Sequence, residues 1–162
     1  MTSTSDTGTG PLIAVVADDL MWASRLVAAV HQAGATPVRM GTDSDVELAF
    51  EAVMRGEPGP TGLADPDEDA PSGLVGAIID LFGHRYDGVT AVRLATAAGL
   101  PVVAMAQHDD QETRRLALEA GAVRVYSYNK FFQDGPALVA RWFVEAPADD
   151  PEQAAADDPN EA

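Results

Sequence analysis

Three carboxylates stand directly after apolar runs, and their placement is the strongest chemical signal in the sequence. Asp80 ends the apolar run 76–80. Asp18 and Asp19 follow the apolar run 12–17. Short apolar runs bounded by turn residues are typical of strands that are buried on both faces. If the two strands are parallel neighbours, their carboxyl ends meet at one edge of the sheet, where open α/β sheets place their sites. The sequence therefore predicts an acidic pocket that contains all three carboxylates.

The acidic character of this pocket argues against several kinds of site. A nucleotide or flavin phosphate is held by backbone N–H groups and small residues after the first strand, whereas the segment that begins with Asp18 and Asp19 would repel it. The chain has no cysteine, which excludes disulfides, thiolate metal sites and a cysteine nucleophile. No Ser-His-Asp, paired-His or Gly-rich constellation supports ordinary catalysis. We therefore expect neither an enzyme nor an organic cofactor. His108, which follows the fourth apolar run, could face the pocket, although a loop histidine is more often solvated.

Strand-like and helix-like patterns alternate along the chain five times. The expected strands span residues 12–17, 36–40, 74–80, 100–106 and 123–126. The expected helices span residues 20–32, 43–56, 88–98 and 110–120, and a last helix runs from residue 131 or 135 to residue 144. Such alternation favours a parallel sheet with right-handed crossovers and helices on both faces. We predict a flavodoxin-like, doubly wound (βα)5 domain, in which a five-stranded parallel sheet forms the middle of three layers.

The net charge of −16 is concentrated in two segments. Residues 56–72 contain five acids and no base, and residues 145–162 contain seven acids and no base. We expect a disordered N-terminus over residues 1–11, one folded domain over residues 12–145 with an acidic insertion at about 56–73, and a disordered acidic tail over residues 146–162. The alternative is a tail that engages a basic partner.

Nucleic acid and membrane are not expected as partners. Nothing in the sequence forms the basic stripe that nucleic-acid binding requires. The longest purely apolar runs have the length of strands, which is far too short for a bilayer, and the first eleven residues lack a basic region and a cleavage-like site. We expect a cytoplasmic protein.

An ordered set of short motifs resembles the receiver domain of two-component response regulators, which has the CheY-like fold. The set spans residues 12–144 and is specific only as a whole. Its members are the acidic pair Asp18-Asp19, Arg25-Leu26 in the first helix, the lone Asp80, the dipeptide Asp87-Gly88, Leu-Pro-Val-Val at residues 100–103 and Glu-Ala-Gly-Ala at residues 119–122.

This resemblance implies roles for the three carboxylates. Asp80 would be the nucleophile that accepts a phosphoryl group from a histidine kinase in a phosphorelay. Asp18 and Asp19, together with Asp80, would hold Mg²⁺, a hard ion that prefers oxygen ligands. The ion is needed because a carboxylate and a phosphoryl group repel each other until a cation lies between them.

The remaining receiver positions do not match the family. Ala106 stands where receivers have a Thr or Ser whose hydroxyl binds the phosphoryl group, and Val125 stands where they have an aromatic switch residue. Their Lys-Pro falls on Tyr128 and Asn129, and Lys130, the one lysine of the chain, lies two residues beyond the lysine position. The acidic half of the receiver site is therefore present, and the switching half is degenerate.

Three functions remain open. We favour a single-domain atypical receiver, or pseudo-receiver, that acts in signalling as a protein-interaction module. The first alternative is a conventional receiver that a histidine kinase phosphorylates on Asp80, and a weaker one is a flavodoxin-like small-molecule binder. The expected partner is a protein, either a histidine kinase or a downstream signalling protein. The expected contact residues lie on the face that receivers use for output, and they are Arg124, Tyr126, Phe131 and Phe132.

Overall fold

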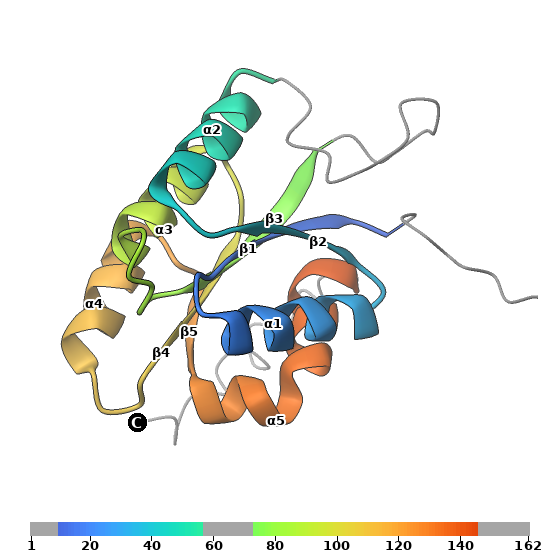
Figure 1. Ribbon diagram of the computed structural model, residues 1–162, viewed down its shortest axis with the longest axis vertical. Coiled ribbons are helices and arrows are strands. Elements are labelled where there is room, and N and C mark those ends of the chain that lie inside the picture. The colour runs from blue at the N-terminus through green and yellow to red at the C-terminus, as the bar shows by residue number, and fades with distance from the viewer. Residues whose placement is uncertain (1–9, 57–72, 146–162) are drawn as a thin grey trace, which may run out of the picture.

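Five parallel strands form one sheet in the order β2-β1-β3-β4-β5 (Figure 1). The computed structural model describes residues 10–56 and 73–145. The strands are β1 (Leu12–Val16), β2 (Thr36–Met40), β3 (Leu74–Asp80), β4 (Val102–Ala106) and β5 (Arg124–Ser127). The helices are α1 (Leu20–Gln32), α2 (Asp43–Met54), α3 (Gly88–Ala97), α4 (Gln111–Ala120) and α5 (Tyr128–Val139), and α5 continues into the π-helical turn η1 (Ala140–Val144). The predicted flavodoxin-like fold with a five-stranded parallel sheet is confirmed.

The helices cover both faces of the sheet and create two apolar cores. Helices α1 and α5 lie side by side on one face, and α2, α3 and α4 lie on the other (Figure 1). Successive residues of a strand point to opposite faces, so Ile13 and Val15 of β1 pack in the core under α1 and α5, whereas Ala14 and Val16 pack in the core under α2, α3 and α4. This double burial is the reason that β1 is an uninterrupted apolar run.

Every α-helix begins just beyond a strand end, at a side chain that accepts a hydrogen bond from a backbone N–H of the first turn. These capping residues are Asp19, Thr42, Asp87, Asp110 and Ser127. Such a cap satisfies one of the free N–H groups at the start of a helix and stabilises it by about 1 kcal/mol. The caps fix where each chain segment turns at the carboxyl edge of the sheet.

The prediction for the start of the last helix is wrong. Helix α5 begins at Tyr128, not at residue 131 or 135, because Ser127 accepts a hydrogen bond from the N–H of Lys130 at 3.2 Å. A kink at Asp134, with φ −122° and ψ 16°, divides α5, and Pro136 lies in the first turn after the kink. The early start places Tyr128 directly at the end of β5.

The predicted N-terminal segment 1–11, the insertion at about 56–73 and the tail 146–162 fall almost entirely outside the described residues. Among the residues that are described, no helix is both long enough and apolar enough to cross a membrane.

Gly76 of β3 lies directly against the ring of Phe143 in η1. A Cβ atom at residue 76 would lie 2.2 Å from the nearest carbon of that ring. This contact attaches the end of the last helical segment to the strand that carries Asp80.

We expect Gly76→Ala to lower the free energy of unfolding by roughly 1–3 kcal/mol, because an added methyl group overpacks the contact. In a chain that also carries Phe143→Ala, the same change should cost much less, because the ring is gone. Urea unfolding of the two single variants, the double variant and the parent chain measures this coupling. Strictly additive losses would contradict the contact.

Candidate functional site at the carboxyl edge of the sheet

Asp80 is the one buried charged residue among those that the structure describes, with 3% of its surface exposed. It is the last residue of β3, so the strand carries it into the sheet edge between its neighbours β1 and β4. Its Oδ1 atom accepts hydrogen bonds from the N–H of Phe82 at 3.0 Å and from the hydroxyl of Tyr128. Both donors are neutral groups.

The pKa of Asp80 is raised above its usual value of 3.8. Burial is the main cause, because it disfavours the charged form. The hydrogen bonds from Tyr128 and Phe82 act in the opposite direction, and the negative charges of Asp18 and Asp19 add to the rise. The two aspartates are therefore close enough to Asp80 to act on it electrostatically.

Asp18 and Asp19 are each bound by backbone N–H groups. Oδ2 of Asp18 accepts from the N–H groups of His84 at 2.6 Å and Arg85 at 2.7 Å, which ties the end of β1 to the segment after β3. Oδ1 of Asp19 accepts from the N–H of Trp22 at 3.0 Å, in the cap of α1. The parallel pairing of β1 and β3 brings all three carboxylates to one edge of the sheet, as their spacing predicts.

These carboxylates are not arranged as a metal site. Within residues 10–56 and 73–145, no group of three or more His, Asp or Glu side chains is placed to hold a metal ion. One oxygen of each of Asp18, Asp19 and Asp80 is engaged by an N–H or O–H donor of the protein. As they stand, the three carboxylates therefore do not converge as three ligands of one ion.

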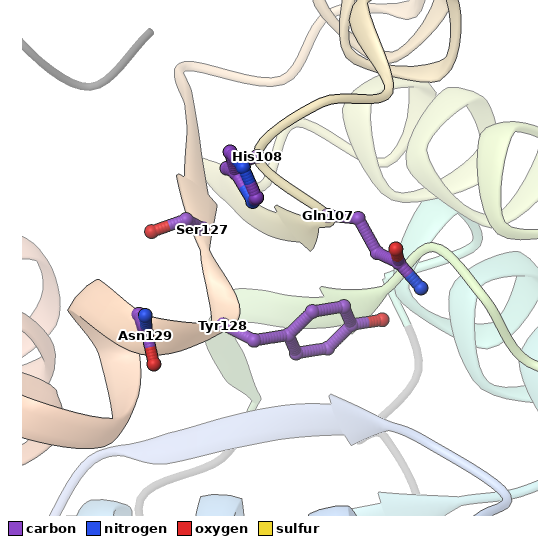
Figure 2. A pocket seen from close by; sticks show the side chains of 5 residues that line it. All are labelled: Gln107, His108, Ser127, Tyr128 and Asn129. Atoms are coloured by element: carbon purple, nitrogen blue, oxygen red, sulfur yellow. The ribbon is translucent and has the colours of Figure 1, made fainter.

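Tyr128 fills the space next to Asp80. Its ring centroid lies 4.6 Å from that of Trp22 in α1 and 6.3 Å from that of Phe82 after β3. Figure 2 shows the ring reaching away from the start of α5, with its hydroxyl at the far end. Burial raises the pKa of the Tyr128 phenol, and the hydrogen bond to Asp80 raises it further, so Tyr128 remains a neutral donor.

A second tyrosine, Tyr86, links two strand ends at the same edge of the sheet. Its buried hydroxyl lies 2.6 Å from the backbone oxygen of Asp80 and 3.0 Å from that of Val16, so it bridges the ends of β3 and β1. Its ring lies over Gly83, where an added Cβ would come within 2.2 Å of it. Sequence reasoning missed this tyrosine, because a lone aromatic residue in a loop carries no periodic signal.

The structure places the predicted switch positions as follows. Ala106 is fully buried at the end of β4 and offers no hydroxyl, and Val125 is buried on the side of β5 that faces the core under α4. Lys130 extends along its own helix, where its ammonium lies 2.9 Å from the carboxylate of Asp134. The side chain of Tyr128, the residue on which the resemblance places the receiver lysine, reaches Asp80.

His108 lines a cavity beside Tyr128 and does not belong to the set of groups that bind Asp80. The cavity has a volume of about 260 Å³ and is lined by Gln107, His108, Ser127, Tyr128 and Asn129 (Figure 2). It lies between the segment after β4 and the start of α5.

Two of the four predicted contact residues are buried. Tyr126 and Phe131 are 1% and 4% exposed, because both point into the core under α1 and α5, where the hydroxyl of Tyr126 accepts a hydrogen bond from the indole N–H of Trp142 at 2.8 Å. The prediction that they contact a partner is therefore corrected. Phe132 is 56% exposed, with the guanidinium of Arg25 lying 4.0 Å from the centre of its ring. Arg124 is half-buried.

No protein-family model matches the sequence, and no curated protein matches it. Solved structures share its fold. The receiver domain of the sensor histidine kinase PA1611 from Pseudomonas aeruginosa, which has a magnesium ion coordinated in its active-site cleft, superposes with a TM-score of 0.59 at 15% identity over 82% of this chain and 97% of that one.

Two further structures superpose with similar scores. The phosphorylated cyanobacterial phytochrome response regulator RcpA gives a TM-score of 0.59 at 14% identity, over 82% of this chain and 94% of its own. The response regulator RPA3017 in red light signaling of R. palustris gives 0.57 at 19% identity, over 84% and 96%. The chain therefore has the fold of response-regulator receiver domains.

We expect Asp80→Asn to stabilise the protein at neutral pH. Because the pKa of Asp80 is raised in the fold, its contribution to stability is fully present below the unfolded value of 3.8 and is lost as the pH rises through the folded value. Asparagine stays neutral and keeps an oxygen for Tyr128. The gain at pH 7 should be on the order of 1 kcal/mol, or about 3 °C in melting temperature.

Thermal unfolding between pH 4 and pH 8 measures this effect, and the gain should shrink toward the acid end of the range. The matched control is Asp109→Asn at an exposed aspartate, which should change little. If Asp80→Asn melts at a lower temperature than the parent chain at neutral pH, the fold stabilises the charged form of Asp80 and the prediction is wrong.

Proposed function

We propose that this protein is an atypical receiver that acts in signalling as a protein-interaction module, without a switch driven by phosphorylation. The observation that carries the proposal is the hydrogen bond from Tyr128 to Asp80. In the receivers that the sequence resembles, an ammonium group stands at this position and pairs with the phosphoryl group. Here the position holds a neutral, bulky phenol.

The positions that would transmit a signal support the same proposal. A modification shifts a conformational equilibrium only when it makes different contacts in the two states. A phosphoryl group on Asp80 would find no hydroxyl at Ala106, and Val125 is an aliphatic core residue that packs under α4. Neither residue has a polar group with which to bind the phosphoryl oxygens. We propose that the outer face of the domain therefore keeps one conformation.

The proposed contact surface is the outer face of α4, β5 and α5. Within residues 111–139, four large apolar side chains are more than a third exposed, and they are Leu116, Leu118, Val123 and Phe132. Helix α4 also carries Arg114, which donates to the backbone oxygen of Val125, and Arg115, which pairs with Glu112 and Glu119. Apolar and arginine side chains together are typical of the centre of protein interfaces. We propose a protein partner, either a histidine kinase or a downstream signalling protein, and no catalytic turnover.

The second candidate is a conventional receiver phosphorylated on Asp80 with the help of Mg²⁺. Its support is the position of Asp80 at the end of β3, beside Asp18 and Asp19, in a fold shared with a structure described as phosphorylated and with one that contains magnesium. A flavodoxin-like small-molecule binder has weaker support, because the carboxylates at this edge would repel a phosphate.

The two candidates differ in how the outer face responds to a phosphodonor. We expect hydrogen exchange of residues 111–126 and 131–139 to be the same with and without acetyl phosphate and Mg²⁺, because neither Ala106 nor Val125 has a polar group through which a phosphoryl group could act on this face. Intact mass reports in parallel whether a phosphoryl group has been added, and Asp80→Asn is the control. A change in exchange that occurs in the parent chain and is absent in Asp80→Asn would establish the conventional receiver.

Partner affinity provides a second, independent test. Asp80→Asn should keep the affinity within about twofold, well below the roughly 1–3 kcal/mol of coupled sites. Phe132→Ala should weaken binding several-fold, because it removes an exposed ring from the proposed surface. Leu48→Ala is the matched control, since Leu48 is 67% exposed on α2, away from this surface. The measurement uses a partner isolated by crosslinking in cells, and strong loss of binding in Asp80→Asn would contradict the proposal.

A further inference from the structure

The acidic pocket contains the residue types that a divalent cation prefers, yet in this structure its carboxylates are bound by groups of the protein. Mg²⁺ binds oxygen ligands in a nearly octahedral shell at about 2.0–2.1 Å and keeps several waters. Such a shell needs free carboxylate oxygens that converge on an open volume. In the described part of the chain, no three such side chains are placed to hold one ion, and Oδ1 of Asp80 is already bound by two donors, although Asp18 and Asp19 act electrostatically on Asp80.

We infer that Tyr128 closes this pocket to divalent cations, with its hydroxyl taking the place of a cation as the partner of Asp80. This inference rests on the proposed function, because it gives the reason that the pocket does not switch. The hydroxyl binds Oδ1 of Asp80, the atom that also accepts the N–H of Phe82. The phenol is kept neutral by burial and by Asp80 itself, so it donates its proton without supplying charge.

The ring of Tyr128 is held in this position from three sides. Trp22 packs against it from α1, with ring centroids 4.6 Å apart and planes inclined by 38°. Phe82 approaches from the segment after β3. The backbone of Tyr128 is fixed because α5 begins there, at the cap formed by Ser127. A cation with its waters could enter only if this ring moved away from Asp80.

The inference is tested by removing the closing side chain and titrating Mg²⁺ alone. Tyr128→Ala removes the ring and the hydroxyl, and by calorimetry it should bind Mg²⁺ at least about tenfold more tightly than the parent chain, a difference of about 1.4 kcal/mol. Tyr128→Phe keeps the packing against Trp22 and removes only the hydroxyl, so its affinity should lie between the two. Adding Asp80→Asn to Tyr128→Ala should abolish the gain, because the carboxylate is then lost.

Leu48→Ala is the control, because it removes an exposed apolar side chain of α2 that lies outside the pocket, and its Mg²⁺ affinity should equal that of the parent chain. Thermal unfolding shows whether each variant is folded. If Tyr128→Ala is not folded, the Mg²⁺ affinity of Tyr128→Phe alone tests the inference. Two results would overturn the inference, namely parent affinity in every folded Tyr128 variant, or a gain that survives Asp80→Asn. A phosphodonor response of the outer face in the parent chain would instead overturn the proposed function and leave the Mg²⁺ titrations to decide the role of Tyr128.

Discussion

The buried carboxylate of Asp80 is the group to which the carboxyl edge of this sheet is adapted. A charge taken out of water needs a partner of opposite charge or enough donors to replace its hydration. The two hydrogen-bond donors that Oδ1 of Asp80 has in the described structure, the N–H of Phe82 and the hydroxyl of Tyr128, are both neutral. Neutral donors offset part of the cost of burial but leave the charge uncompensated, which is why the pKa of Asp80 is raised in spite of both hydrogen bonds.

The use of a phenol as the donor to Asp80 explains why aromatic side chains pack around the pocket. An ammonium group would reach a carboxylate on a thin, flexible stem, whereas a phenol brings a rigid ring that must itself be packed. Trp22 and Phe82 supply that packing, and Tyr86 links the backbone ends of β1 and β3 beneath it. The contacts thus join α1, β3 and α5 at the point where a receiver would keep an open cleft. The pocket is held by the same kind of apolar contact as the core.

Sequence patterns predicted the fold well because its determinants are local. Apolar runs and capping residues mark each strand and each helix start, and the positions of Asp18, Asp19 and Asp80 follow from the strands that precede them. The start of α5 was missed because residues 128–130 show no helical periodicity, and the cap by Ser127 is a single side-chain contact. The burial of Tyr126 and Phe131 but not Phe132 depends on which face α1 and η1 cover. The bond between Tyr128 and Asp80 joins residues 48 positions apart, which no local pattern encodes.

Spacing and chemistry carry different information in this chain. The fold follows that of receiver structures at 14–19% identity, and the backbone places residue 128 directly after the end of β5. The residue type at position 128 then decides which groups the pocket can bind. A phosphoryl group on Asp80 would lie near the carboxylates of Asp18 and Asp19, a neutral phenol and the methyl group of Ala106. The carboxylates repel it, the methyl group offers no hydrogen bond, and the phenol has no charge to offset the repulsion. A modification shifts a conformational equilibrium only when it makes different contacts in the two states, which is the reason for the proposal that the outer face keeps one conformation.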